Sequence, residues 1–297
     1  TLMSDNLQSL IKLLIIEDDP KIIEHVSNEL VKKGHGIIDT LQTVADTHNQ
    51  VAVSDIIEDI IHRIHCRQLH TDLKHWATFR DDDLLEGLLL VASFQYPFLE
   101  VSIVKERLAE LQRCATDDVL PTCATTKAIS ILSNNIYGRF EYKVAPEQDC
   151  SHDVRLYYIN DMLSRRKTSP TLMAAIYYLC SSQLNIPTWF IDTPDALTLG
   201  FGQRVVKRKV EKTYQPKQNN GIKIDCYLNI DKGTIEAVKS FQNQLEESGI
   251  YDYLEALIPV DNKRVIQRLL EELAQIYKNS RNRVRYRELR HLATVLN

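Results

Sequence analysis

A helix with a marked start and a marked end is the feature that most constrains this fold. It lies within RRKTSPTLMAAIYYLCSSQLNIP, residues 165–187. Ser169 followed by Pro170 is typical of a first helical turn, and Asn185 ahead of Ile-Pro is typical of an end. Apolar residues recur between these limits at helical spacing, at Leu172, Met173, Ile176 and Leu179. The pattern predicts a core helix.

Short β-type runs follow this helix directly. The runs TWFID (188–192) and ALTLGF (196–201) flank a turn, and IKIDCYLNI (222–230) alternates well enough to pair with them. The segments before and after this region have mostly helical periodicity. The sequence therefore predicts an α+β fold, mostly helical, with helices packed on a small antiparallel sheet.

Composition and charge exclude several classes of function. A chain of 297 residues, 44% of them hydrophobic, suits one large domain or two to three small ones. Its net charge of −4 gives no electrostatic reason to expect nucleic acid or an anionic membrane as partner. We find neither a membrane-spanning run nor a signal-peptide pattern, and the six cysteines lack paired spacing. We therefore expect a cytoplasmic protein with reduced thiols and no cofactor.

The N-terminal part has the pattern of paired helices. An apolar stripe over residues 7–14 is followed by Asp19 and Pro20, a capping residue and a helix-starting proline, and a second stripe ends at Gly34. Weaker stripes then repeat the pattern with a period of about 30 to 40 residues, which resembles HEAT repeats.

The same segment has an alternative interpretation. IKLLIIEDD could form a buried strand of a phosphate-accepting receiver domain, with Asp55 as phosphoacceptor. The βα alternation that a doubly wound sheet requires does not follow it, so we favour the helical interpretation.

A group of histidines lies in HRIHCRQLHTDLKHW, residues 62–76. On a helix, His62, His65 and Cys66 share one face, so a metal site is conceivable there. No second ligand pair follows at metal-site spacing, and the neighbouring residues are those of a solvated helix surface. We therefore expect ordinary surface and core histidines and no metal ion.

Three segments, in this order, carry a resemblance to a known family. They are LLEGLLLVASFQYPFLE, YYINDMLSRRKTSPTLMAAIYYLCSSQLNIP and YLNIDKGT. The chain from residue 83 to 297 resembles the transglutaminase-like SirB family, and the second segment is the most specific. The resemblance implies a HEAT-like helical region at 1–78, a transglutaminase-like domain at 79–255 and a tetratricopeptide-like helical hairpin at 256–297.

The resemblance also implies where a catalytic triad would lie. Acyl transfer of this kind needs a thiolate, an imidazole and a carboxylate or amide that orients the imidazole. The three positions fall at Thr171, Ala196 and Asn229, so thiol and imidazole are both missing. No histidine occurs between His152 and His291. We therefore expect a degenerate triad.

These observations predict a non-catalytic transglutaminase-fold protein that binds a protein or peptide partner. The basic segments 204–217 and 278–290 would suit an acidic partner. The alternative is a cysteine-type hydrolase or acyl transferase with relocated chemistry, through Cys180, Cys226 or a hydroxyl of Ser169 or Thr171. The candidate residues of the binding cleft are Pro170, Thr171, Asp195, Ala196, Asn229 and Asp231.

Overall fold

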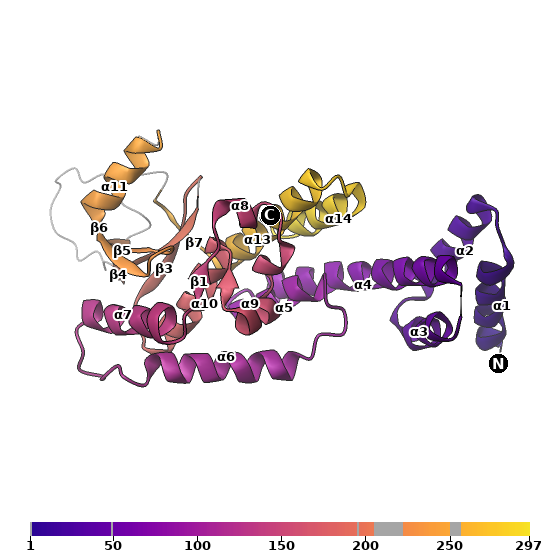
Figure 1. Ribbon diagram of the computed structural model, residues 1–297, viewed down its shortest axis with the longest axis horizontal. Coiled ribbons are helices and arrows are strands. Elements are labelled where there is room, and N and C mark those ends of the chain that lie inside the picture. The colour runs from indigo at the N-terminus through magenta and orange to yellow at the C-terminus, as the bar shows by residue number, and fades with distance from the viewer. Residues whose placement is uncertain (1, 49, 195, 205–221, 250–256) are drawn as a thin grey trace. The chain divides into compact units, whose positions relative to one another are not determined.

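The structure is a computed structural model that describes residues 2–48, 50–194, 196–204, 222–249 and 257–297. It is mostly helical and contains a small antiparallel sheet, as the sequence predicts (Figure 1). Packing divides the chain into two compact units, Thr1–Lys74 with Ser93–Phe98, and His75–Ala92 with Leu99–Asn297. The division into domains at 1–78, 79–255 and 256–297 stays a prediction.

The first unit consists of consecutive short helices and the first part of a long one. Asp19 caps the second helix by accepting a hydrogen bond from the Lys21 amide at 2.9 Å, Pro20 lies in its first turn, and Gly34, at φ 72°, ends it. Buried aliphatic residues such as Leu30 form the hydrophobic core of this unit. Its elements are α1 (Leu2–Ile16), α2 (Pro20–Lys33), the 3₁₀ turn η1 (His35–Ile37), α3 (Ile38–Thr47) and α4 (Val51–Phe79).

The first unit contains the segments for which the sequence allowed a receiver-domain strand and a metal site. The run proposed as a receiver-domain strand lies in α1, so that interpretation is wrong. Cys66 Sγ lies 3.0 Å from His62 Nε2, whereas the His65 ring packs edge-on against His35. Burial, together with nearby His35, lowers the pKa of His65. The three residues of the conceivable metal site therefore do not converge on one point.

The second unit contains the remaining helices and both sheets. Close approach of its helices depends on Gly87 in α5, where a Cβ atom would lie 2.7 Å from Trp76 Cζ2 and 2.9 Å from Ile266 Cγ1. The helical elements are α5 (Leu84–Ser93), α6 (Val101–Thr116), α7 (Thr125–Ser133), the π-helical turn η2 (Asn134–Arg139), α8 (Glu147–Cys150), the 3₁₀ turn η3 (Val154–Tyr157), α9 (Ile159–Arg165), α10 (Pro170–Gln183), α11 (Val238–Glu247), α13 (Asn262–Asn279) and α14 (Arg283–Thr294).

The main sheet has five strands in the order β6-β5-β4-β3-β7, and every neighbouring pair is antiparallel. The three runs predicted from the sequence form β3, β4 and β5, whereas β6 and β7 were not predicted. A separate parallel pair joins β1 and β2. The strands are β1 (Lys143–Val144), β2 (Lys167–Thr168), β3 (Thr188–Asp192), β4 (Leu197–Arg204), β5 (Ile222–Asn229), β6 (Thr234–Ala237) and β7 (Pro259–Val260).

The central helix α10 begins and ends where the sequence predicts. Ser169 Oγ accepts a hydrogen bond from the Leu172 amide at 3.3 Å, and Pro170 is the first helical residue. At the other end Asn185 adopts a positive φ of 52°. Most of the helix is buried, and it packs against β3, β4, α6, α7 and α13 (Figure 1). The sheet and the surrounding helices thus fix the start of α10 in space.

Some predicted features lie outside the described residues. These are Asp195, most of the basic segment 204–217, and most of the run YDYLEAL (251–257), for which the sequence predicts a helix. Across the described part of the chain, no helix has both the length and the apolar character that crossing a bilayer requires.

Candidate binding cleft

A cavity of about 470 Å³ lies at the N-terminus of α10, within the second unit. Its wall is made by β1 and the loop after it, by α8, η3 and the start of α10, by the turns before β4 and after β5, and by α13. Segments distant in sequence therefore meet here. The polar part of the wall consists of Glu147, Cys150, Tyr157, Thr171, Asp231 and Glu272.

Backbone hydrogen bonds hold these segments together. The Ala145 amide donates to the carbonyl oxygen of Thr168 at 2.8 Å, which extends the β1–β2 pair to the cavity. The Ser169 amide donates to the carbonyl oxygen of Leu156 at 2.8 Å, which ties the start of α10 to η3. The N-terminus of α10 is thus fixed between two loops of the cavity wall.

The structure brings most of the predicted cleft residues to this cavity. The ones that line it are Pro170, Thr171, Ala196 and Asp231. Thr171 and Ala196 occupy the positions expected for the nucleophile and the imidazole, so the two degenerate positions share one cavity.

The third degenerate position, Asn229, forms hydrogen bonds within the turn between β5 and β6 and does not line the cavity with the other two. Its side-chain amide donates to Glu236 Oε1 at 2.7 Å, and its Oδ1 accepts from the Lys232 amide at 3.0 Å. Asn229 is not among the described residues that line the cavity. It therefore shapes the β5–β6 turn, which carries the lining residue Asp231.

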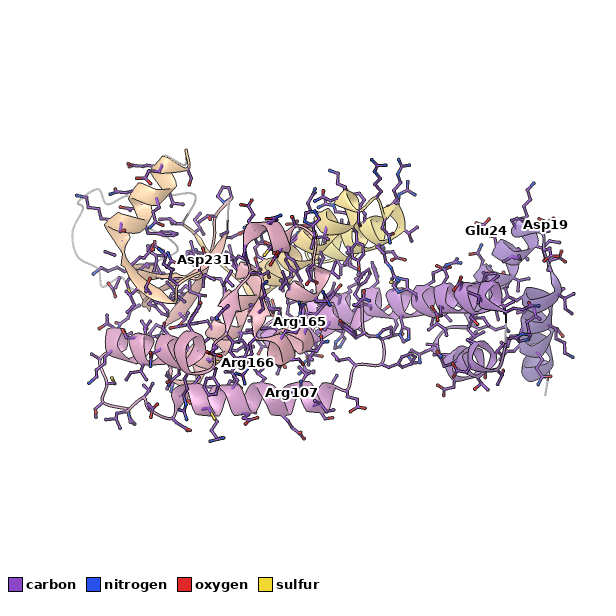
Figure 2. The ribbon with its side chains drawn as sticks, in the orientation of Figure 1. Asp19, Glu24, Arg107, Arg165, Arg166 and Asp231 are labelled. Atoms are coloured by element: carbon purple, nitrogen blue, oxygen red, sulfur yellow. The ribbon has the colours of Figure 1, made fainter. Side chains whose placement is uncertain are left out.

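Close packing supports the same turn. Gly233 has a φ of 67°, and a Cβ atom there would collide with the Tyr137 ring. The Tyr137 hydroxyl donates to the carbonyl oxygen of Ile230 at 2.6 Å. These contacts fix the backbone on both sides of Asp231, which is labelled in Figure 2.

The hydroxyl of Thr171 has a carboxylate as its acceptor. Thr171 is 1% exposed, and its Oγ1 donates to Glu272 Oε1 at 2.8 Å. Arg268 Nε donates to the same oxygen at 2.9 Å. Burial raises the pKa of Glu272, and Arg268 and the Thr171 hydroxyl oppose this only in part. The start of α10 thus presents a hydrogen-bonded hydroxyl and a partly buried carboxylate.

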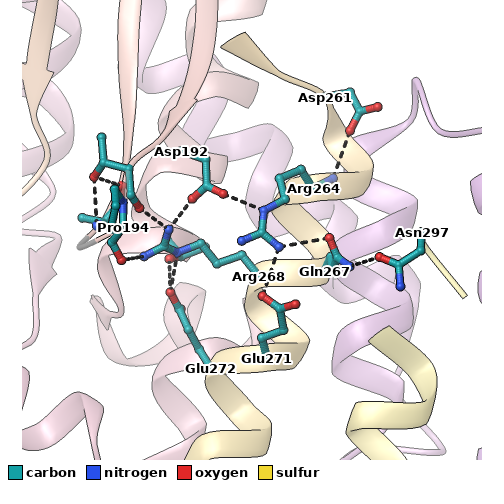
Figure 3. A network of polar contacts seen from close by, with 12 residues as sticks. Asp192, Pro194, Asp261, Arg264, Gln267, Arg268, Glu271, Glu272 and Asn297 are labelled. Carbon is teal, nitrogen blue, oxygen red and sulfur yellow. Dashed lines mark hydrogen bonds and ion pairs between the residues drawn. The ribbon is translucent and has the colours of Figure 1, made fainter. Parts of the chain in front are cut away.

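Arg268 of α13 connects this carboxylate to the end of β3, and Arg264 of the same helix contacts the end of β3 as well (Figure 3). Arg268 forms an ion pair with Asp192 and donates to the carbonyl oxygen of Thr193 at 2.7 Å. Arg264 Nε lies 2.6 Å from Asp192 Oδ2, and its Nη1 lies 3.0 Å from Glu271 Oε2. The turn that leads to Ala196 is therefore fixed to α13.

The sequence did not point to Cys150, and it favoured core packing over a place in the cleft for Tyr157, although both line the cavity. The Tyr157 hydroxyl donates to the carbonyl oxygen of Cys150 at 3.0 Å. Burial, with a smaller effect of Glu272, raises the pKa of Cys150 to about 11 and also raises the pKa of Tyr157. With such a pKa, the Cys150 thiol is protonated at neutral pH.

The residues considered for relocated chemistry are buried. Cys180 has no exposed surface, and burial raises the pKa of its thiol to about 12. Burial also raises the pKa of Cys226. Ser169 is fully buried, and its hydroxyl oxygen caps α10. Because a reactive thiol is exposed and has a low pKa, neither cysteine has the environment of a nucleophile.

The cavity has an acidic character. Glu147 and Asp231 are exposed carboxylates of its wall, and Glu272 lies deeper. No lysine, arginine or histidine is among the described residues that line it. Neither Glu147 nor Asp231 has an ion-pair partner within the part of the chain that the structure describes. The arrangement would attract a cation or a basic side chain.

A comparison with protein families supports the assignment of this fold. The profile described as the transglutaminase-like superfamily matches residues 103–271, more than half of the chain. The chain belongs to the transglutaminase-like superfamily. Searches of curated proteins and of solved structures found no match.

The transglutaminase-like match begins in α6 and ends within α13. It includes α10 and the whole main sheet, and therefore almost all of the cavity wall; Glu272 lies one residue beyond its end. The predicted fold class is confirmed, and the cavity at the start of α10 lies in the transglutaminase-like part of the chain.

Proposed function

We propose that this transglutaminase-like protein is non-catalytic and binds a segment of a partner protein in the cavity at the start of α10. The observation that carries the proposal is the hydrogen bond between Thr171 and Glu272. It occupies the point at which an acyl-transfer enzyme of this fold would need an activated thiol.

The chemistry of the remaining groups supports this proposal. Acyl transfer needs a nucleophile whose proton passes to a base and later to the leaving group. A threonine hydroxyl gives up its proton far less readily than a thiol, and a carboxylate is a weak base at neutral pH. Losing a general base alone costs about 10²-fold to 10⁴-fold in rate. Here thiol and imidazole are both missing from their expected positions.

Size and charge indicate what the cavity binds. A volume of about 470 Å³ lies within the range of about 300–1,000 Å³ that is usual for ligand pockets. Glu147 and Asp231 supply unpaired negative charge, Glu272 adds a carboxylate that is already paired with Arg268, and no described lining residue is a cation. We therefore infer that the bound segment inserts a lysine or arginine side chain, whose charge these carboxylates neutralise.

One observation favours a second function. The hydrogen bond from Thr171 to Glu272 is the contact that a hydroxyl nucleophile would make with a carboxylate base. Under this alternative the protein is a hydrolase or acyl transferase that acts through Thr171. The raised pKa values of Cys150, Cys180 and Cys226 argue against a cysteine version of it.

The proposal also covers the narrower family, the flanking helical regions and the cellular location. The order of the three quoted segments supports membership of the SirB family within the superfamily. The helices of the first unit and the α13–α14 pair would then be HEAT-like and tetratricopeptide-like flanking regions, and the protein would act in the cytoplasm. Helical repeats of this kind present extended surfaces to protein partners.

A binding experiment separates the two functions. Fluorescein-labelled ten-residue peptides with a central lysine, arginine or norleucine are titrated with the full chain, and anisotropy gives the dissociation constants. We expect the basic peptides to bind at least about tenfold more tightly than the norleucine peptide, and Asp231→Asn to remove most of this difference. Glu29→Gln, which alters an exposed carboxylate of the first unit, serves as the control.

The same preparations are tested for turnover. Incorporation of a fluorescent primary amine into casein and hydrolysis of p-nitrophenyl acetate are both measured, with Thr171→Val as the matched variant. We expect no enzyme-dependent rate. A rate that disappears in Thr171→Val would establish the alternative, and equal affinity for all three peptides would refute the proposed ligand.

A further inference from the structure

The C-terminal helical hairpin carries a group of exposed arginines. Arg281 lies in the turn between α13 and α14, and Arg283, Arg287 and Arg290 follow in α14. Their spacing of four and three residues places the last three on one helix face, over a length of about 10 Å. We call Arg281, Arg283, Arg287 and Arg290 the arginine face.

The charges of the arginine face are not neutralised within the described residues, where none of the four side chains has an ion-pair or hydrogen-bond partner. Other arginines of the same hairpin differ in this respect. Arg264 and Arg268 pair with carboxylates, and Arg285 lies 3.7 Å from Glu288. The unpaired guanidinium groups of Arg283, Arg287 and Arg290 therefore lie on one helix face, with Arg281 in the turn just before it, in a chain whose net charge is −4.

The hairpin holds this face in a fixed position. The opposite side of α14 buries Leu289, Leu292 and Ala293. Asn282 caps the helix by accepting a hydrogen bond from the Arg285 amide at 3.1 Å. Because the helix is anchored in this way, the arginines present a pattern of charge with defined spacing.

We propose that the arginine face binds an acidic segment of a partner protein. A guanidinium group accommodates both oxygens of a carboxylate, which gives stronger and more directional contacts than a lysine ammonium gives. Steps of three and four residues along α14 correspond to about 5–6 Å between side chains. Carboxylates at alternate positions of an extended segment, about 6–7 Å apart, or along one face of a helix, match this spacing.

Two features favour an acidic protein segment over nucleic acid. Val284, which follows the first of these helical arginines, is 62% exposed and offers an apolar contact that a phosphate backbone does not use. The negative net charge of the chain also repels a long polyanion, whereas a short acidic segment engages the arginine face alone. This surface is separate from the acidic cavity proposed to bind a basic side chain.

The test uses the full chain and a fluorescein-labelled 16-residue peptide of alternating glutamate and serine. Anisotropy titrations are performed at 50 and 200 mM salt. The variant Arg283→Gln/Arg287→Gln/Arg290→Gln removes three charges of the face. The control Arg113→Gln/Lys127→Gln/Arg139→Gln removes three exposed charges elsewhere in the second unit. A third variant replaces the same three α14 arginines by lysine.

We expect binding that weakens with salt and is at least about tenfold weaker in the glutamine variant, with less than a twofold change in the control. The lysine variant should bind with intermediate affinity, because charge remains and bidentate contacts are lost. Thermal unfolding followed by circular dichroism confirms that each variant is folded. Equal losses in the glutamine variant and the control would refute the proposal, and so would tighter binding of a 16-base-pair DNA duplex by the unmodified chain.

Discussion

Thr171 donates its hydroxyl hydrogen bond to a residue 101 positions away in sequence, Glu272 of α13. The floor of the cavity therefore depends on the C-terminal hairpin as much as on α10. Arg268 reinforces this dependence, because its guanidinium contacts both Glu272 and the end of β3. Thr171, Glu272 and Arg268 thus form a continuous polar connection from α10 through α13 to the end of β3.

The first prediction concerns the thiol that lines the cavity. Because burial and Glu272 raise the pKa of Cys150 to about 11, its alkylation by iodoacetamide at pH 8 should be at least about a hundredfold slower than that of N-acetylcysteine. Mass spectrometry of tryptic peptides after timed quenching measures the rate. Glu272→Gln should lower the pKa of Cys150 and speed the reaction, whereas Glu29→Gln should leave it unchanged. Rapid alkylation of Cys150 at pH 7 would contradict this prediction.

A second prediction tests the link between β3 and α13. Arg268→Met leaves Glu272 without its guanidinium partner and removes one of the two partners of Asp192. Because both carboxylates are largely shielded from water, we expect a loss of about 2–3 kcal/mol in the free energy of unfolding. Arg264→Met is the comparison. It should cost less, because the Arg264 side chain is 32% exposed and that of Arg268 is 11% exposed. Urea unfolding followed by fluorescence gives both values, and equal costs would argue against a special role for Arg268.

The third prediction concerns the turn that carries Asp231. Gly233→Ala introduces a Cβ at a positive φ and into the Tyr137 ring. We expect a loss of about 2–3 kcal/mol in the free energy of unfolding. Gly249→Ala also lies at a positive φ, of 84°, but has open space around it, so its cost should be near 1 kcal/mol. The difference between the stability losses of the two variants measures the steric effect of the Tyr137 ring. Equal Tm values for the two variants would show that this ring has no such effect.

The fourth prediction is a pH dependence. Burial places the pKa of Glu272 in the folded protein above its ordinary value of 4.5, so the folded state binds more protons than the unfolded state above that pH. The stabilisation from this proton is complete below about pH 4.5 and is lost as the pH rises through the folded pKa. Glutamine imitates the protonated acid. The free energy of unfolding of the wild type, minus that of Glu272→Gln, should therefore fall as the pH rises above 4.5. A constant difference would show that Glu272 keeps its ordinary pKa.

Much of the fold could be predicted because its signals are local. Ser169 and Pro170 mark the start of α10, and Asn185 follows its end, without reference to any other segment. The strands β3, β4 and β5 could be predicted from alternating or β-branched residues. In contrast, β6 has four residues and β7 has two, so neither is long enough to establish a pattern. Both are strands because a neighbouring strand pairs with them.

The site could be predicted only in part, for a related reason. The family resemblance pointed to Thr171 and Ala196, which lie on segments that the sequence marks clearly. Glu272 could not be distinguished from its neighbour Glu271 by composition or periodicity. One residue along a helix changes the direction of a side chain by about 100°, so Glu271 contacts Arg264 while Glu272 reaches Thr171. Cys150 became part of the wall only because η3 and α8 fold beside α10.

The position of Glu272 also limits how this chain could change over evolutionary time. A single Thr171→Cys replacement would place a thiol against a carboxylate, which raises the pKa of the thiol and leaves it unreactive. Arg268 also fixes the turn before position 196 by donating to the carbonyl oxygen of Thr193. A thiol at position 171 would therefore become reactive only after Glu272 in α13 had been replaced, so the order of these two substitutions matters.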